Sequence, residues 1–333
     1  MVYAFLYIVL FSLFYSVGYV VTKNKLLYID LPFSKDLSIV GKGVAIAIVV
    51  YGHLGNLFGI RYLTPLGGIG VSMFLILSGY GINESWLKYG DQHFWRKRLV
   101  SVYVPYLLVG AITIPLRGGY QSIIQALLDL TAIRPQYYLG WYITYLFFWY
   151  GIYYLAMRFI KKRIYRYEMW IVVGIVILSF TRVLYARQGF AFFIGLVLSD
   201  NKQYFELLRK KRNILGLLFM GIALLGIKQI PTVRTFPTAI MNCMEMLMTT
   251  GFAVSVLLLL EKINGRFLMP LYYLGIISYE IYLIHGYTLW IVDLSFVNAI
   301  AFYCLTIGVA FAIHVPIKTL QDNITKGLKR NCC

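Results

Sequence analysis

The sequence predicts an all-α protein that crosses a membrane many times. Of its 333 residues, 60% are hydrophobic and only 13% are charged, whereas a soluble domain has about 45–50% apolar and about 25% charged residues. Apolar runs of about 20 residues, the length that a helix needs to cross a bilayer, alternate with short charged clusters along the whole chain. These observations exclude a soluble enzyme, a nucleic-acid reader and a disordered scaffold.

Apolar segments predict about eleven transmembrane helices. The first has no Lys or Arg before Lys23 and ends without a small-residue cleavage site, so we expect a retained helix rather than a signal peptide. The seventh is too short for a full crossing and is expected to be tilted or shielded by its neighbours. In order, the segments are 3–21, 37–57, 66–83, 99–116, 137–157, 169–185, 188–198, 213–230, 236–260, 267–292 and 296–316.

The distribution of basic residues gives an orientation. Alternate loops, beginning with 22–36, contain 23 Lys and Arg, and the other loops contain five. Because Lys and Arg concentrate in cytoplasmic loops, this asymmetry predicts the N-terminus outside and the C-terminus in the cytoplasm. The net charge of +18 then reflects contact with anionic headgroups rather than with nucleic acid. The four cysteines lack the paired spacing of a zinc site, and we expect no metal.

Five ionisable residues lie well inside apolar segments, where such a group is costly and marks a candidate functional site: Lys42, His53, Glu245, Glu280 and His285. Lys42 and His53 are eleven residues apart, which is three helical turns to within about 20°, so they project from one face about 16 Å apart along the axis. By the charge distribution, Lys42 lies near the cytoplasmic side and His53 lies deeper. The alternative is that Lys42 extends to the headgroups and His53 is a structural histidine.

The tenth segment contains a second candidate set. Ser278, Tyr282 and His285 follow the spacing i, i+4, i+7 and form one stripe of a helix. Glu280 projects about 200° from Ser278. One helix face cannot present both to a single cavity, so we expect either the stripe or Glu280 to face the site and the other to pair with a neighbouring helix.

Two further features have structural as well as functional interpretations. The third segment is rich in glycine between residues 67 and 81, which allows another backbone or a ligand to approach closely. A basic cluster that includes Arg96 and Arg98 stands at a helix entrance, where it can hold phosphates. Plain helix packing and ordinary cytoplasmic charge are the alternatives.

Taken together, these residues resemble the membrane acyltransferase-3 family. The resemblance spans residues 36 to about 316 and rests on five motifs that occur in order. They are Lys42 and His53 separated by ten residues, Gly70-Val71-x-x-Phe74-x-x-x-Ser78-Gly79-Tyr80, the Arg96–Arg98 cluster before Pro105-Tyr106, Gly140-Trp141-Tyr142, and Ser278-Tyr279-x-x-Tyr282-Leu283-x-His285. Many members have arginine where this chain has Lys42, which keeps the charge and loses the bidentate fork.

The resemblance implies a ten-helix acyltransferase core at 36–316, preceded by an additional transmembrane helix at 1–22 and followed by a basic cytoplasmic tail at 317–333. It also implies transfer of an acyl group, usually acetyl, from cytoplasmic acyl-CoA to a glycan hydroxyl. Acyl-CoA is then a co-substrate, and no tightly bound cofactor is expected.

Roles for individual residues follow from the same resemblance. We expect His53 to be the base that takes the proton of the hydroxyl. Lys42, Arg96 and Arg98 are expected to bind acyl-CoA, and Glu280 and His285 are further catalytic candidates beside His53 and Lys42. The other motif residues are candidates for substrate binding: Ser78, Tyr80, Trp141, Tyr142, Ser278, Tyr279 and Tyr282.

Other functions and partners are left open. A transporter or flippase for a lipid-linked glycan is the main alternative, since intramembrane charges and glycines suit it too. A catalytically inactive protein that binds acyl-CoA or glycan is a third. The expected partners are acyl-CoA, a surface or capsular polysaccharide or its lipid-linked precursor, and the lipids of a bacterial plasma membrane, with no nucleic acid. The acceptor, the choice of acetyl or succinyl, the side of modification and self-association are undetermined.

Overall fold

The computed structural model describes residues 2–22, 34–60, 63–117, 120, 122–135, 139–180, 183–293 and 295–330. All regular structure in these residues is helical, which confirms the predicted all-α class. Contacts divide the chain into two compact units. The first unit is Met1–Lys88 with Tyr153–Ile276, and the second unit is Tyr89–Ile152 with Ile277–Cys333.

The first unit contains the glycine-rich helices of the N-terminal third and the run of helices that ends before Ile277. Helix α7 (Trp141–Phe159) enters this unit at Tyr153. The other helices are α1 (Val2–Thr22), α2 (Lys35–Leu57), α3 (Thr64–Tyr89), α8 (Arg163–Phe180), α9 (Val183–Ala186), α10 (Ala191–Asp200), α11 (Lys202–Leu208), α12 (Lys211–Ile227), α13 (Pro231–Arg234), α14 (Thr238–Leu260) and α15 (Gly265–Ile276).

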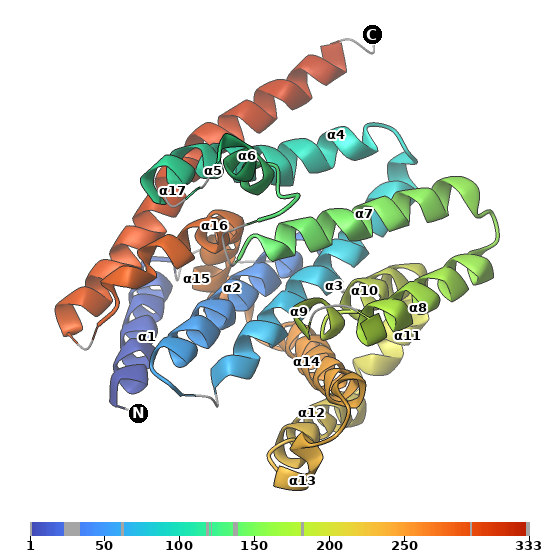
Figure 1. The fold of residues 1–333 in the computed structure, drawn as a ribbon, viewed down its shortest axis with the longest axis horizontal. Helices are drawn as coiled ribbons and strands as arrows, with labels where there is room; N and C mark the ends of the chain where they lie inside the picture. Colours follow the sequence, from blue (N-terminus) through green and yellow to red (C-terminus); the bar gives the residue numbers. More distant parts are fainter. Residues whose placement is uncertain are drawn as a thin grey trace. The chain divides into compact units, whose positions relative to one another are not determined.

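Helix α2 packs against α15 and α3 in the first unit (Figure 1). It begins at a cap in which the Ser34 hydroxyl accepts a hydrogen bond from the Leu37 amide at 3.1 Å. Glycines bring its backbone against α15, because a Cβ on Gly43 would overlap the Leu271 carbonyl oxygen and a Cβ on Gly275 would overlap that of Ile39. The two helices therefore pack closer than larger residues allow.

The additional helix α1 docks on α15 and α2. Tyr19 stacks on Phe267 with the ring centroids 5.1 Å apart, and the Tyr15 hydroxyl donates to the Phe267 carbonyl. The Tyr51 hydroxyl of α2 donates to the carbonyl of Tyr7 at 3.1 Å. The helix that the sequence analysis expects in addition to the ten-helix core is thus part of the packed first unit.

The second unit contains a basic helix entrance and the C-terminal helices. Its elements are α4 (Phe94–Arg98), the π-helix η2 (Leu99–Tyr103), α5 (Val104–Arg117), α6 (Ile123–Leu130), the first part of α7, α16 (Ser278–Thr288), the 3-10 helix η3 (Leu289–Ile291) and α17 (Phe296–Arg330). Elements α4, η2 and α5 follow one another without a break and form one long helix.

Fewer helices than expected are long and apolar enough to cross a membrane. In the described part of the chain there are six, or seven if α15 and α16 are counted as one broken span. The segments expected at 188–198 and 213–230 correspond to α10, with 10 residues, and α12, with 17 residues. Both helices are shorter than the roughly 20 residues that a crossing needs. The membrane class is confirmed, whereas the count of eleven stays a prediction. Residues 137–138 and 181–182, inside two other expected segments, lie outside the described residues.

Two expected boundaries differ in the structure. The segment at 267–292 is not one helix, because it breaks at Ile277, whose φ of −103° and ψ of 14° leave the helical region. Glycine, two β-branched isoleucines and a serine are adjacent at 275–278, and all have low helix propensity. The last expected span ends at 316, whereas helix α17 continues to Arg330, into the range expected for the basic tail. Residues 331–333 lie outside the described residues.

Candidate functional site

Lys42 and His53 project from one face of a continuous helix, as their spacing predicts. Both lie in α2, and Ile46 and Val49 occupy the same face between them. These two apolar side chains are each 1% exposed, whereas Lys42 is exposed and His53 is half-buried. The face therefore has polar groups at its two ends and a buried apolar strip in its middle.

Close helix contacts flank this face on both sides. Gly43, which packs on Leu271 of α15, projects about 100° to one side of Lys42. Gly52, whose Cβ would lie 2.5 Å from the Gly67 amide nitrogen of α3, projects about 80° to the other side. The face that bears the lysine and the histidine thus lies between α3 and α15.

The opposite face of α2 meets α1. Tyr51 projects about 180° from Lys42, and its ring packs edge-on against Phe11 with the centroids 5.5 Å apart. Lys42 and His53 are therefore turned away from α1.

Helix α3 places its candidates beside the lysine end of that face. A Cβ on Gly41 would lie 3.1 Å from Leu77 Cδ1, so the turn that contains Ser78 is level with Lys42. Ser78 and Tyr80 are both half-buried, on either side of Gly79, whose Cβ would overlap the Phe192 carbonyl oxygen of α10. The predicted substrate-binding residues of α3 thus lie near the predicted acyl-CoA end.

A polar cluster lies at the other end of α3. The Ser72 hydroxyl donates to Gln188 Oε1 at 2.7 Å, and Gln188 Nε2 donates to the Gly68 carbonyl at 3.1 Å. Gly67, next in the chain to Gly68, packs on Gly52, one residue before His53. Gln188 is a buried residue that sequence reasoning missed. No sequence signal marks it, because it lies in a short connection between helices.

In the second unit, Tyr282 forms a cluster with three other predicted site residues. Its hydroxyl donates to the Leu139 carbonyl at 2.6 Å, and its ring centroid lies 5.2 Å from that of Tyr142 and 5.9 Å from that of His285. Trp141 packs edge-on against Tyr142. The stripe predicted for the tenth segment therefore meets the start of α7.

His285 has a defined orientation in this cluster. It is fully buried, and its Nδ1 lies 3.0 Å from the Ile281 carbonyl oxygen. Because a carbonyl only accepts, this hydrogen bond assigns the hydrogen to Nδ1, and the neutral ring then has its lone pair on Nε2. Ser278, on the same stripe, is also buried.

Glu280 faces the other side of α16 and pairs with a neighbouring helix. Its Oε1 lies 2.9 Å from Nδ1 of His314 in α17. Tyr279, also outside the stripe, donates from its hydroxyl to the Val102 carbonyl in η2 at 2.8 Å. Of the two arrangements that the sequence left open, the helix pair is therefore made by Glu280.

The basic cluster of α4 divides into exposed and buried members. Arg96 is exposed, whereas Arg98 is 9% exposed, with its guanidinium 4.5 Å from the Phe94 ring centroid. Nη1 of Arg98 donates to the Phe94 carbonyl at 3.3 Å. The two arginines therefore do not present one common surface for phosphates.

No group of three or more His, Cys, Asp or Glu side chains suited to a metal occurs among the described residues.

A family model described as an acyltransferase domain, that of the acyltransferase-3 family, matches residues 38–317. Comparisons with the curated proteins and with the solved structures find no match. The matched range contains every residue that the sequence placed in the site.

Proposed function

Because the chain belongs to the acyltransferase-3 family, we propose that this membrane acyltransferase moves an acetyl group from acyl-CoA to a hydroxyl of a surface polysaccharide or of its lipid-linked precursor. The observation that carries the proposal is the face of α2, between α3 and α15, that bears both Lys42 and His53. The basic loops favour acyl-CoA on the cytoplasmic side of a bacterial plasma membrane.

His53 is the proposed base. A sugar hydroxyl is a weak nucleophile, and a neutral imidazole suits the removal of its proton. As His53 takes this proton, the hydroxyl oxygen bonds to the thioester carbonyl carbon and forms a tetrahedral intermediate. The intermediate then loses the C–S bond, and the thiolate takes the proton from the imidazolium. One hydroxyl and one thioester thus give one ester and one CoA thiol.

Lys42 is the proposed anchor for the donor. An ammonium group binds a phosphate or a carbonyl of the pantetheine arm as a compact positive charge. The separation of about 16 Å along α2 suits an extended pantetheine that reaches from Lys42 to His53. Ile46 and Val49, buried between them, limit the access of water to the thioester. Arg96, which is exposed, is the arginine better placed for the nucleotide phosphates.

A His53→Ala variant tests the base. With the protein in lipid nanodiscs, acetyl-labelled acetyl-CoA and O-deacylated oligosaccharides from the surface glycan, we expect transfer to fall by about 10²–10⁴-fold, the usual contribution of a general base. Equal yield and an unchanged size-exclusion profile serve as the folding control. Near-normal turnover in the variant contradicts the assignment.

A Lys42→Ala variant tests the anchor in the same assay. We expect the apparent KM for acetyl-CoA to rise, and Lys42→Arg to restore it because the charge is retained. Lys318→Ala, which removes an exposed lysine of α17, is the matched control. An unchanged KM in Lys42→Ala removes this residue from the donor site.

A further inference from the structure

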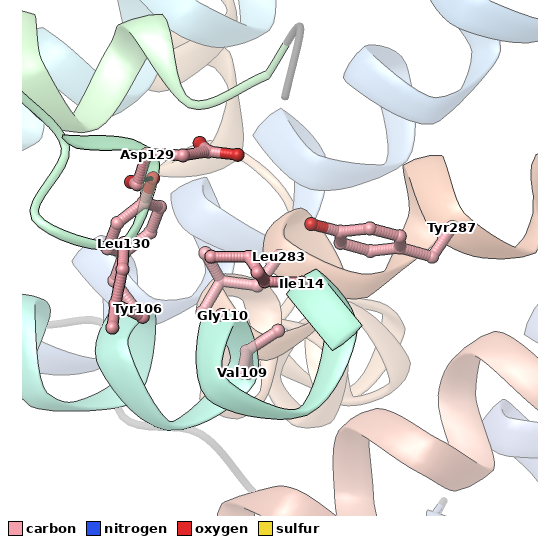
Figure 2. Close-up of a pocket in the computed structure, with 8 residues that line it drawn as sticks. All are labelled: Tyr106, Val109, Gly110, Ile114, Asp129, Leu130, Leu283 and Tyr287. Atoms are coloured by element: carbon pink, nitrogen blue, oxygen red, sulfur yellow. Dashed lines mark hydrogen bonds between the residues drawn. The ribbon is translucent and has the colours of Figure 1, made fainter. Parts of the chain in front are cut away.

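The cavity drawn in Figure 2 lies in the second unit, between α5, α6 and α16. Its lining includes Tyr106, Asp129 and Tyr287. It has room for about one or two water molecules. A sugar ring is much larger, so this cavity is not a site for a glycan.

Three cations of the first unit gather around one carboxylate. Glu245 of α14 is buried, with Arg187 Nη1 2.9 Å from its Oε1 and Lys228 Nζ in contact with its Oε2. Arg234 lies beside Lys228, since its Nε donates to the Lys228 carbonyl at 3.3 Å. We call these four residues the Arg187 cluster.

The Arg187 cluster carries more positive than negative charge. Glu245 is the one Asp or Glu in the ranges 37–83, 169–198 and 213–260. Among the described residues, Arg234 bonds to the Lys228 carbonyl and to Gln229 Oε1 but to no carboxylate. Three cations and one carboxylate therefore leave a surplus of two positive charges.

This surplus lies on the side of the membrane where basic residues are scarce. Arg187 and Arg234 are two of the five Lys and Arg in the loops that the charge distribution predicts to be outside. The preference of basic residues for the cytoplasm does not account for cations that meet on the other side. An uncompensated group of them attracts anions.

Arg187 has donor capacity beyond its pair with Glu245. Its Nε is buried and has no hydrogen-bond partner among the described residues. The Arg187 side chain is 34% exposed and that of Lys228 is 20% exposed, so a ligand can reach both side chains. Glu245 thus holds the two cations in place and leaves part of each open.

Two consecutive residues tie the connection before α10 to two helices. Arg187 pairs with Glu245 of α14, and Gln188 Nε2 donates to the Gly68 carbonyl of α3 at 3.1 Å. Helices α14 and α3 also touch, since a Cβ on Gly68 would lie 3.1 Å from Cγ2 of Thr249, one turn after Glu245. The position of Arg187 is therefore fixed relative to both helices.

The same contacts place the Arg187 cluster at the His53 end of α2. Gly67, next to Gly68 in the chain, packs on Gly52, and His53 follows Gly52. All these residues belong to the first unit. The cluster is thus on the side of the proposed base, whereas Lys42 lies three turns away along α2.

We propose that the Arg187 cluster binds an anionic group of the acceptor glycan, either the carboxylate of an acidic sugar or a phosphate. A guanidinium binds such a group through two parallel hydrogen bonds, and a neighbouring ammonium adds a compact positive charge. Arg187 is then a specificity-determining residue that selects acidic acceptors. The inference rests on the proposed function, because it names the acceptor class of that reaction.

Binding without acetyl-CoA tests the site apart from the reaction. The probes are end-labelled, O-deacylated oligosaccharides of the surface glycan, separated by anion exchange into neutral and anionic fractions, with the protein in phosphatidylcholine nanodiscs. We expect Arg187→Gln to raise the Kd of the anionic fraction about tenfold or more, the value of a lost charge-assisted hydrogen bond. Arg187→Lys should give a smaller rise, because it keeps the charge and loses the fork. Arg212→Gln, which removes an exposed arginine at the far end of α12, is the matched control.

Chemical treatment of the probes identifies the anion. Reduction of carboxyl groups turns uronates into neutral sugars, and a phosphatase removes terminal phosphates. The treatment that abolishes the Arg187-dependent binding names the group, and binding that survives both treatments overturns the proposal. Phosphatidylglycerol added to the nanodiscs tests a lipid headgroup, and an effect of Arg187→Gln on this lipid alone also overturns it.

Transfer assays with acetyl-CoA separate this proposal from the proposed function. Transfer to the neutral fraction with an acceptor KM unchanged in Arg187→Gln overturns the anion site and leaves the proposed function intact, as does a surface glycan without an anionic fraction. Binding that depends on Arg187 without any transfer bears out the site and contradicts the proposed function. If Arg187→Gln does not fold, Arg187→Lys and Arg234→Gln decide, because both keep a cation at Glu245. An unchanged Kd in these two variants overturns the site.

Discussion

At the scale of single residues, Glu245 illustrates how a buried charge finds partners that its own helix does not supply. Its position in an apolar segment predicts that a partner is needed. In the structure, Arg187 Nη1 lies 2.9 Å from Glu245 Oε1, and Lys228 Nζ contacts Oε2. These cations come from elements other than the helix that carries Glu245, so the need for a partner was predictable and its identity was not.

This arrangement predicts that replacing Glu245 destabilises the protein more than replacing Lys228. We expect Glu245→Gln to destabilise the protein by roughly 1–2 kcal/mol, because two partly buried cations lose their counter-charge. Lys228→Met should cost less, since Arg187 still neutralises the carboxylate. Thermal unfolding of the detergent-purified protein measures both, with Asp322→Asn as the surface control. Equal losses, or a larger loss in Lys228→Met, contradict the shared-carboxylate arrangement.

At the scale of elements, glycines set how closely helices of the first unit approach. A glycine from each of helices α3 and α10 packs against the backbone of the other helix. A Cβ on Gly79 of α3 would overlap the Phe192 carbonyl oxygen of α10, and a Cβ on Gly195 of α10 would overlap the Ile76 carbonyl oxygen of α3. The abundance of glycine in α3 predicts close packing without naming the partner helix. Gly81, two residues further along α3, has no atom within 4 Å of a built Cβ.

This difference predicts opposite results from the same substitution in one helix. Gly79→Ala should lower stability by about 1–3 kcal/mol, the usual cost of overpacking, because two backbones have to separate. Gly81→Ala should be neutral or slightly stabilising, since alanine is the better helix former. Unfolding midpoints in the same detergent compare the two, and a loss as large in Gly81→Ala shows that the contact with α10 is not the cause.

At the scale of the whole molecule, the number of crossings decides where the ends lie. Eleven crossings place the N-terminus and the C-terminus on opposite sides, as the 23-to-5 distribution of basic residues requires. The described part of the chain has six or seven apolar helices of sufficient length. Eleven crossings are reached only if shorter helices such as α12, with 17 residues, also cross the membrane with neighbouring helices shielding their ends.

Reporter fusions test this topology. A C-terminal fluorescent protein should fold and fluoresce in the cytoplasm, and an alkaline phosphatase at the same place should be inactive. An N-terminal cysteine tag should react with a membrane-impermeant maleimide in intact cells, with a cysteine at Lys161, in a loop predicted to be cytoplasmic, as the negative control. Labelling that places both ends on one side rules out an odd number of crossings.

The sequence by itself determined the all-α membrane class, the family and the shared face of Lys42 and His53. These depend on composition, on ordered motifs and on helical periodicity, which are local properties. The tertiary structure decided that Glu280 pairs with His314, that the tenth segment breaks at Ile277, and that the segment after α5 folds back so that the carbonyl of the buried Asp129 accepts a hydrogen bond from Tyr106. These depend on contacts between residues distant in the chain, which local periodicity does not encode.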